Sequence, residues 1–137
     1  MRIDVIGVLV DDQDKAVRFY TEKLGFTVRQ DVAVGEARWL SVGSSEQPDG
    51  PQLLLEPRDN PNATIEGQPA AHRYQQALYE AGIPFTMFTV NNIAAEYRRL
   101  TGAGVAFVGN LVEVPGGKTA VFDDTCGNLI AIMEVTE

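Results

Sequence analysis

The chain has very few of the residues on which several common kinds of site depend. Its 137 residues include one cysteine, Cys126, and one histidine, His72. One cysteine excludes an intramolecular disulfide framework and is typical of a reducing compartment. One histidine excludes the zinc and iron sites that need two or three histidines. The sequence also lacks the glycine-rich phosphate-binding loops and the Gly-x-Ser-x-Gly turn of many serine hydrolases.

Positive charge and long apolar runs are scarce as well. Lysine and arginine number 11 against 19 aspartate and glutamate residues, so the formal net charge is −8. This excess disfavours binding to nucleic-acid phosphates, which needs clustered basic side chains. The sequence has neither a run of about 18 apolar residues, as a membrane span needs, nor a charged-then-apolar start, as an export signal has. We therefore expect one cytoplasmic domain with no nucleic-acid or membrane partner.

The first half of the chain has the hydrophobic periodicity of a mixed α and β fold. Alternating apolar residues over 2–10 indicate a strand. Asp11 and Asp12 can then cap a helix that starts near Gln13 and ends at Gly25. Further strands are expected over residues 26–32, 37–43 and 52–56, and a surface loop over 57–70.

The second half repeats this order of elements. We expect a short helix over 74–81, a strand over 85–90, a helix over 93–101 and strands over 105–108, 113–114, 119–122 and 129–135. Three landmarks recur at offsets of 80, 79 and 77: Val8-Leu-Val-Asp-Asp12 with Phe88-Thr-Val-Asn-Asn92, Leu24-Gly-Phe26 with Ala103-Gly-Val105, and Gly50 with Gly127. Because these landmarks keep nearly one spacing, the sequence predicts two βαβββ modules, each too small to bury its sheet face alone.

Two motifs resemble the vicinal oxygen chelate superfamily, which holds the glyoxalase, bleomycin-resistance and extradiol dioxygenase proteins. One is the run from Val10 to Tyr20 followed by Leu24-Gly-Phe26, and the other is the turn Asp123-Asp-Thr-Cys-Gly-Asn-Leu129. The resemblance spans nearly the whole chain. It implies an α+β fold of two tandem βαβββ modules with curled mixed sheets around a cleft, usually in a homodimer. The single domain would then consist of module one at about 1–57, a linker and short helix at about 58–83, and module two at about 84–137.

Active members of that superfamily place metal ligands on the first and last strands of each module. The resemblance maps these positions to Val5, Leu54, Phe85 and Ala131. All four are apolar, and none can bind a divalent cation. If the register of the first module is shifted by two, Glu56 takes the place of Leu54, but one carboxylate does not make a metal site. We therefore expect no metal cofactor, with a divalent metal as the alternative.

Period-two alternation places a largely apolar set of side chains on the cleft side of the sheets. The expected ligand-binding residues are Val5, Gly7, Leu9, Trp39, Leu54, Glu56, Phe85, Met87, Ala131 and Met133. The opposite faces, with residues such as Val8, Leu55 and Ile130, are expected to pack under the helices. A cleft with few polar groups favours an apolar or aromatic ligand.

Several polar residues have both a functional and an ordinary structural interpretation. Glu56 is a candidate for a catalytic carboxylate, and equally for a solvated residue at a strand end. His72 is expected at a solvated position, with an acid–base role at the cleft rim as the alternative. Asp123 and Asp124 are expected to form a turn rather than a catalytic pair. Cys126, inside that turn, is expected to be an inert thiol.

Expectations also follow for three further side chains on strands that flank the expected cleft. Trp39 can stack on an aromatic ligand or simply pack. Arg38 is expected to face the helices and extend to solvent. Glu134 is expected to be a charge at the rim or at an interface.

The sequence therefore favours a metal-free homodimer that binds a small, largely apolar or aromatic molecule, similar to the bleomycin-resistance branch. The alternative is a divergent lyase, isomerase or dioxygenase of the same superfamily that uses a metal or the Glu56 carboxylate. An extradiol dioxygenase is the least favoured of these, because its iron site needs two histidines. A regulatory domain whose cleft is only a packing seam is a third alternative. Whether the chain is an enzyme stays open at this point.

Overall fold

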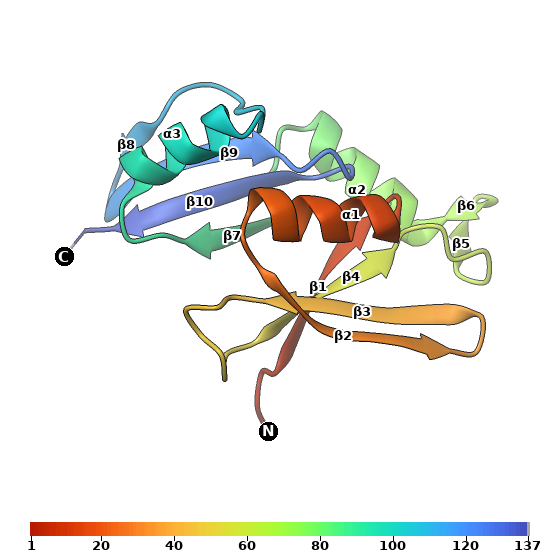
Figure 1. The fold of residues 1–137 in the computed structure, drawn as a ribbon. Helices are drawn as coiled ribbons and strands as arrows, with labels where there is room; N and C mark the ends of the chain where they lie inside the picture. The colour runs from red at the N-terminus through yellow and green to blue at the C-terminus, as the bar shows by residue number, and fades with distance from the viewer. Residues whose placement is uncertain (137) are drawn as a thin grey trace. The chain divides into compact units, whose positions relative to one another are not determined.

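Each half of the chain forms one mixed four-stranded sheet, in a computed structural model that describes residues 1–136. The chain divides into two compact units, residues 1–74 and the part that starts at Gln75, and each is described by itself. In both, a strand is followed by a helix and then by the other three strands of its sheet (Figure 1). The predicted pair of βαβββ modules and the α+β fold class are confirmed.

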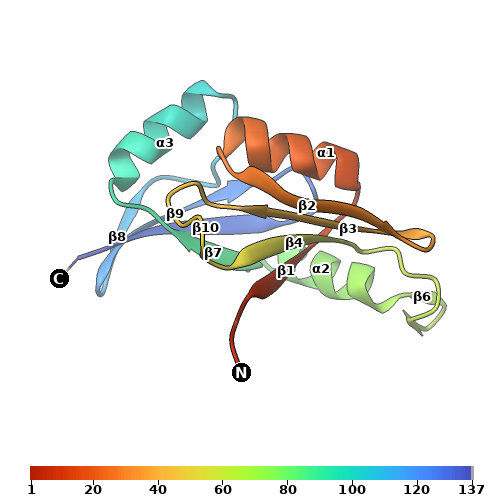
Figure 2. The same cartoon turned by 60° about the horizontal axis from the view of Figure 1, so that its bottom comes forward.

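The first unit contains the sheet with strand order β1-β4-β3-β2 (Figure 2). Its strands are β1 (Val5–Val10), β2 (Thr27–Val34), β3 (Ala37–Gly43) and β4 (Gln52–Pro57). The connection from β1 to β2 passes through α1 (Gln13–Arg18) and a π-helical turn, η1 (Phe19–Lys23). Strands β1 and β4 are parallel, with Val5 opposite Gln52 and Val10 opposite Pro57. The other two pairs are antiparallel.

The second unit repeats this arrangement with strand order β7-β10-β9-β8. Its elements are β7 (Thr86–Thr89), α3 (Ile93–Gly102), β8 (Val112–Val114), β9 (Gly117–Asp123) and β10 (Leu129–Val135). Strands β7 and β10 are the parallel pair, and α3 packs on β9 and β10. Helix α2 (Ala70–Glu80) precedes this sheet in the chain. No helix within residues 1–136 is long and apolar enough to span a membrane.

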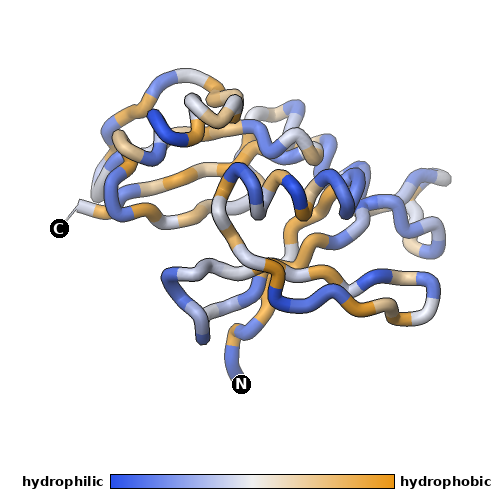
Figure 3. Tube along the Cα trace, viewed as in Figure 1, coloured by the Kyte–Doolittle hydropathy of each residue, from blue (hydrophilic) through white to orange (hydrophobic). Residues whose placement is uncertain are grey.

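The side chains that alternation places under the helices supply most of the core of each unit, although Leu54 and Ala131 on the opposite faces are buried as well. Val8, Val10 and Leu55 are fully buried in the first unit, and Ile130 is fully buried in the second. Hydrophobic residues accordingly follow the strands, whereas several connecting turns are hydrophilic (Figure 3). Ile6, on the same face of β1, is 47% exposed and lies near the start of the strand, before its well-buried part.

The two units begin their principal helices in the same way. The Asp12 carboxylate accepts a hydrogen bond from the backbone N–H of Lys15 at 3.1 Å and caps α1. Eighty positions later, the Asn92 side chain accepts one from the backbone N–H of Ala95 at 3.1 Å and caps α3. Such caps satisfy N–H groups that have no partner within the helix. The expected cap at Asp12 is confirmed, and the repeat in sequence is a repeat in local structure.

Replacing Asn92 with alanine is expected to lower the free energy of unfolding by about 1 kcal/mol, because the first turn of α3 loses its side-chain cap. Asn91→Ala is the matched control, since Asn91 is exposed and the cap is supplied by its neighbour. Urea denaturation followed by circular dichroism measures both variants. Equal stability of the two would show that the side-chain cap contributes nothing.

Three expected elements differ in the structure. Residues 105–108 were expected to form a strand, but this was wrong: they make one isolated bridge, Phe107 opposite Phe122. Gly109, with φ of +90°, turns the chain away directly after this bridge. Helix α2 begins at Ala70 rather than near residue 74, and the expected loop before it contains a short hairpin, β5 (Thr64–Ile65) with β6 (Gln68–Pro69). Alternation and helical spacing cannot be read over such short segments.

Candidate functional site

A pocket of about 310 Å³ lies within the first unit. Four of the residues predicted to contact a ligand line it: Leu9, Trp39, Leu54 and Glu56. The other lining residues are Arg38, Leu55, Pro57, Asn60, Ala63 and Ala71. Its walls therefore come from β1, β3, β4, the segment that follows β4 and the first turn of α2. The volume is at the lower end of the range of about 300–1,000 Å³ that is usual for small-molecule sites.

The pocket lies beside the point where the side chain of Gln13 bridges β3 and β4. These two strands are paired at Ser41 opposite Leu54 and at Val42 opposite Leu53. Further along, Nε2 of Gln13 donates hydrogen bonds to the carbonyl oxygen of Arg38 at 3.1 Å and to that of Leu55 at 2.9 Å. The first residue of α1 thus satisfies a carbonyl on each strand. Arg38 and Leu55, the two residues whose carbonyl groups Gln13 bridges, both line the pocket.

Trp39 forms one wall of the pocket and is held by a polar contact at its edge. Its indole Nε1 donates a hydrogen bond to Oε1 of Gln30 at 2.9 Å, and Gln30 lies on the neighbouring strand β2. The side chain is 38% exposed, so part of the ring surface remains open to a ligand. An aromatic ring whose polar edge is bonded and whose face is accessible can stack on an aromatic molecule. Direct ligand contact by Trp39 stays a prediction.

The carboxylate of Glu56 lies against Gly7. A Cβ atom on Gly7 would lie 2.6 Å from Oε2 of Glu56 and 3.1 Å from its Cδ, so the glycine leaves the space that the carboxylate fills. Glu56 is opposite Leu9 in the parallel pair, and Gly7 is opposite Leu54. These four predicted residues therefore share one face of β1 and β4. Within residues 1–136 the exposed carboxylate of Glu56 has no hydrogen-bond or ion-pair partner.

Arg38 also lines the pocket, but its charge is already paired. Its Nε and Nη2 bind the carboxylate of Asp31 at 2.8 and 2.9 Å, and its Nη1 binds Asp14 at 2.7 Å. These hydrogen bonds, Asp31 first and then Asp14, raise the pKa of Arg38 above its usual value. The bond from Arg38 lowers the pKa of Asp31. Asp14 lies in α1, so the expectation that Arg38 faces the helix is confirmed, although it binds carboxylates rather than extending freely to solvent.

The remaining lining residues come from the segment after β4 and the first turn of α2, and most of this segment was predicted as a surface loop. Ala63 and Ala71 line the pocket from either side of the β5–β6 hairpin, and the backbone N–H of Ala70 donates to the carbonyl oxygen of Ala63 at 2.9 Å. Nδ1 of His72 lies 3.3 Å from Oδ1 of Asp59, and neither residue lines the pocket. Alanine carries no sequence signal for ligand contact, so this part of the lining could not be predicted.

The other predicted ligand-binding residues are distributed over both sheets. Val5 and Gly7 share the face of Leu9 in β1, outside the residues that line the pocket. In the second unit Met87 is opposite Ala131, and Met133 is opposite Thr89. Phe85 lies just before β7, and its backbone N–H donates to the carbonyl oxygen of Leu129 at 2.8 Å. That these second-unit residues contact a ligand stays a prediction.

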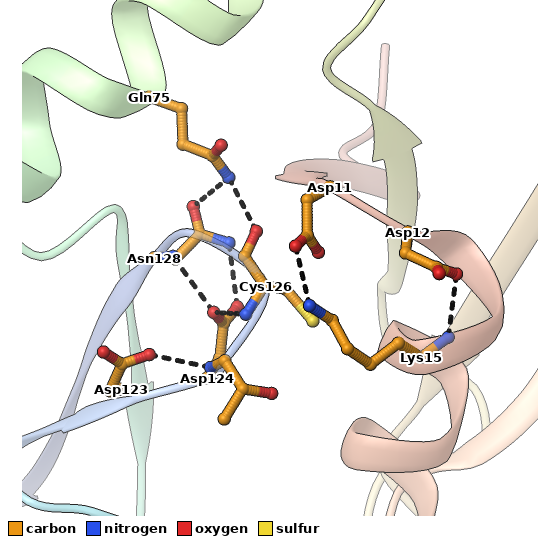
Figure 4. A network of polar contacts seen from close by, with 9 residues as sticks. Asp11, Asp12, Lys15, Gln75, Asp123, Asp124, Cys126 and Asn128 are labelled. Carbon is orange, nitrogen blue, oxygen red and sulfur yellow. Dashed lines mark hydrogen bonds and ion pairs between the residues drawn. The ribbon is translucent and has the colours of Figure 1, made fainter.

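The paired aspartates near the end of the second unit form a turn, as expected (Figure 4). The fully buried carboxylate of Asp124 accepts hydrogen bonds from the backbone N–H groups of Cys126 and Asn128 at 2.8 and 3.0 Å, and from Nδ2 of Asn128 at 2.8 Å. Gln75, also buried, donates to Oδ1 of Asn128 and to the carbonyl oxygen of Cys126. Asp123 instead accepts bonds from the Thr125 N–H and from the hydroxyl of Tyr79, whose pKa it raises. The structure thus gives both aspartates structural contacts.

Glu134 also has a role that the sequence did not reveal. Its Oε2 accepts a hydrogen bond from the backbone N–H of Ile93 at 3.1 Å, in the first turn of α3. A carboxylate at this end of a helix is stabilised by the helix dipole as well. The expected rim or interface charge is therefore a contact that anchors α3 to β10.

The four positions to which the resemblance maps the superfamily's metal ligands carry side chains that do not suit a metal ion. Val5, Leu54, Phe85 and Ala131 carry no oxygen, nitrogen or sulfur atom in their side chains, whereas metal ions bind such donors. Nor do residues 1–136 bring three or more histidine, cysteine, aspartate or glutamate side chains together in a group that could hold a metal ion. The donor chemistry of these residues therefore does not fit the metal that the fold suggests.

Known proteins match this chain over almost its full length. The chain matches the model of the Glyoxalase/Bleomycin resistance protein/Dioxygenase superfamily over residues 2–132. It is 45% identical over 134 residues to the protein YurT of Bacillus subtilis (strain 168), covering 98% of this chain and 99% of YurT.

Solved structures show the same similarity. UcmS2 is 37% identical with a TM-score of 0.82, over 97% of each chain. TnmS3, an antibiotic binding protein from Streptomyces sp. CB03234, is 26% identical with a TM-score of 0.73, over 99% of this chain and 97% of its own. The two βαβββ units, the family match and these relatives agree, and the chain belongs to the Glyoxalase/Bleomycin resistance protein/Dioxygenase superfamily.

Proposed function

We propose that this protein binds a small apolar or aromatic molecule in the pocket of its first unit, without a metal ion. The observation that carries the proposal is the pocket itself, where Trp39, Leu9 and Leu54 present apolar surface. Pockets of this composition favour ligands with apolar or aromatic surface. The lack of donor atoms at the superfamily's metal positions supports binding without a metal.

The comparisons support the same class of function. TnmS3 is described as an antibiotic binding protein, and it shares the fold with this chain over nearly the full length of both. A binding protein of this kind needs a shaped apolar site and no catalytic group. We therefore propose sequestration of a small molecule rather than its chemical conversion, by a homodimer in the cytoplasm. Light scattering after size-exclusion chromatography tests the homodimer.

The tryptophan of the pocket gives a direct measurement of binding. The chain has one tryptophan, so its indole N–H gives a single resonance in a ¹H–¹⁵N correlation spectrum. Titration with 2-naphthalenemethanol, a neutral aromatic probe, is expected to move this resonance in a saturable way, because the ring lines the pocket. The dissociation constant is expected to stay the same after dialysis against EDTA and after addition of Zn²⁺, Ni²⁺, Mn²⁺ or Fe²⁺.

Two results would contradict this proposal. An indole resonance that stays in place, together with no heat of binding by calorimetry, would show that the pocket does not take the aromatic probe. Binding that EDTA abolishes and added metal restores would show that the site depends on a metal after all. Turnover of a substrate would instead support the enzyme alternative.

A further inference from the structure

We propose that the pocket selects aromatic molecules that carry a positive charge, such as a protonated amine, and that the Glu56 carboxylate is the partner of that charge. This inference rests on the proposed function and narrows it to a class of ligand. Three features of the first unit carry it: the unpaired carboxylate of Glu56, the paired charge of Arg38 and the apolar surface beside Glu56.

The first feature is that Glu56 places a negative charge in the pocket wall without a cation to match it. Within the part of the chain that the structure describes, its carboxylate has no hydrogen-bond or ion-pair partner. Its position against Gly7 keeps it on the face that also carries Leu9 and Leu54. A ligand ammonium group that reaches this face can form a charge-assisted hydrogen bond with the carboxylate.

The second feature is that Arg38 cannot serve as an equivalent site for an anion. Its guanidinium donates to both oxygens of Asp31 and to Asp14. Two carboxylates around one guanidinium leave a net negative charge at this side of the pocket. Arg38 and Glu56 are the charged residues among those that line the pocket, so the fixed charge around it favours a cation. The overall charge of −8 acts in the same direction on approach.

The third feature is the apolar surface beside Glu56. Leu9 lies opposite Glu56 on β1, and Leu54 lies two residues before it on the same face of β4. Trp39 supplies an aromatic ring to the same pocket. A ring system that covers these side chains would exclude water from part of the carboxylate, and a cation near the indole face gains a further attraction. A ligand that combines an aromatic ring with an amine satisfies both parts of the site.

The test uses three probes that share one ring system and differ in charge. They are 2-naphthylmethylamine as the cation, 2-naphthalenemethanol as the neutral probe and 2-naphthoate as the anion. At pH 7 and low salt, calorimetry on the wild-type chain is expected to give an affinity for the amine about 3- to 10-fold higher than for the alcohol, a modest ratio because the carboxylate is exposed. The anion is expected to bind most weakly.

A matched pair of variants assigns the selectivity to Glu56. In Glu56→Gln the ratio of amine to alcohol affinity is expected to fall close to one. Glu36→Gln removes the same charge from an exposed turn between β2 and β3, outside the pocket, and is expected to keep the wild-type ratio. Circular dichroism and thermal melting establish that both variants are folded.

The outcomes separate this inference from the proposed function. Equal affinity for amine and alcohol, or an unchanged ratio in Glu56→Gln, would overturn the preference for a cation while the pocket still binds aromatic molecules. Tightest binding of 2-naphthoate would overturn it in favour of Arg38 as the recognition group. Failure of all three probes to bind would overturn the pocket itself, and both proposals with it.

Discussion

Replacing Asp124 with alanine is expected to lower the free energy of unfolding by about 3–4 kcal/mol, a large part of the about 5–15 kcal/mol that stabilises an ordinary domain. The carboxylate is fully buried and accepts hydrogen bonds from the backbone of Cys126 and from the backbone and side chain of Asn128. In the variant these N–H groups remain buried and lose their acceptor. Buried polar groups without partners cost more than the hydrogen bonds themselves contribute.

The consequences of this substitution extend beyond the turn. Nε2 of Gln75, in α2, donates to Oδ1 of Asn128 at 3.0 Å and to the carbonyl oxygen of Cys126 at 3.2 Å. The hydrogen bonds of Gln75 therefore depend on the positions in which the turn holds these two acceptors. Loss of the Asp124 carboxylate therefore loosens the contact between α2 and the turn before β10. We expect faster hydrogen exchange at the amides of Cys126 and Asn128 in the variant, at denaturant concentrations where the chain is still folded.

The neighbouring aspartate provides the control. Asp123 lies next to Asp124 and also accepts hydrogen bonds, from Thr125 and Tyr79, but both of these are at exposed positions. Asp123→Ala is therefore expected to cost less than about 1 kcal/mol, since its partners can bond to water. Urea denaturation of both variants measures the difference. Equal losses in the two would show that burial of the Asp124 network does not determine its contribution.

The order of elements could be predicted because the sequence carries it twice. The alternation in β1 and in β10, the capping residues Asp12 and Asn92, and the glycines that follow the helices are local signals with direct physical causes. The prediction of a strand over residues 105–108 was wrong for a reason that apolar alternation does not contain. They are apolar enough for a strand, but Gly109 turns the chain after one bridge to β9.

The candidate site could be predicted only in part. Alternation, together with the positions that the resemblance supplies, places Leu9, Leu54 and Glu56 on one face, and the structure brings them to one pocket. The bridge that Gln13 makes between β3 and β4 depends on the packing of α1, and no residue pattern in the sequence predicts it. The pairing of Arg38 with Asp14 joins residues 24 positions apart and depends on the same packing. Contacts of this kind follow from the fold rather than from spacing.

Trp39→Ala is expected to weaken binding of 2-naphthalenemethanol about 10- to 30-fold, because the substitution removes the aromatic wall of the pocket. Tryptophan is among the residue types enriched in the few side chains that contribute most of the binding energy at protein interfaces. The ring is positioned before any ligand arrives, since its Nε1 is bonded to Gln30, so little ordering opposes its contact with a ligand. Isothermal titration calorimetry measures the loss, because the variant no longer carries the indole resonance.

Two further variants decide whether this loss belongs to the ring. Val32→Ala truncates the residue opposite Trp39 on β2, which is 51% exposed and does not line the pocket, and it is expected to keep the wild-type affinity. Trp39→Phe keeps an aromatic face but cannot donate to Gln30, and is expected to lose less than Trp39→Ala. If Val32→Ala weakens binding as much as Trp39→Ala, the effect comes from the β2–β3 pair as a whole. In that case the indole would be a packing residue, and the aromatic preference of the pocket would have to come from Leu9 and Leu54.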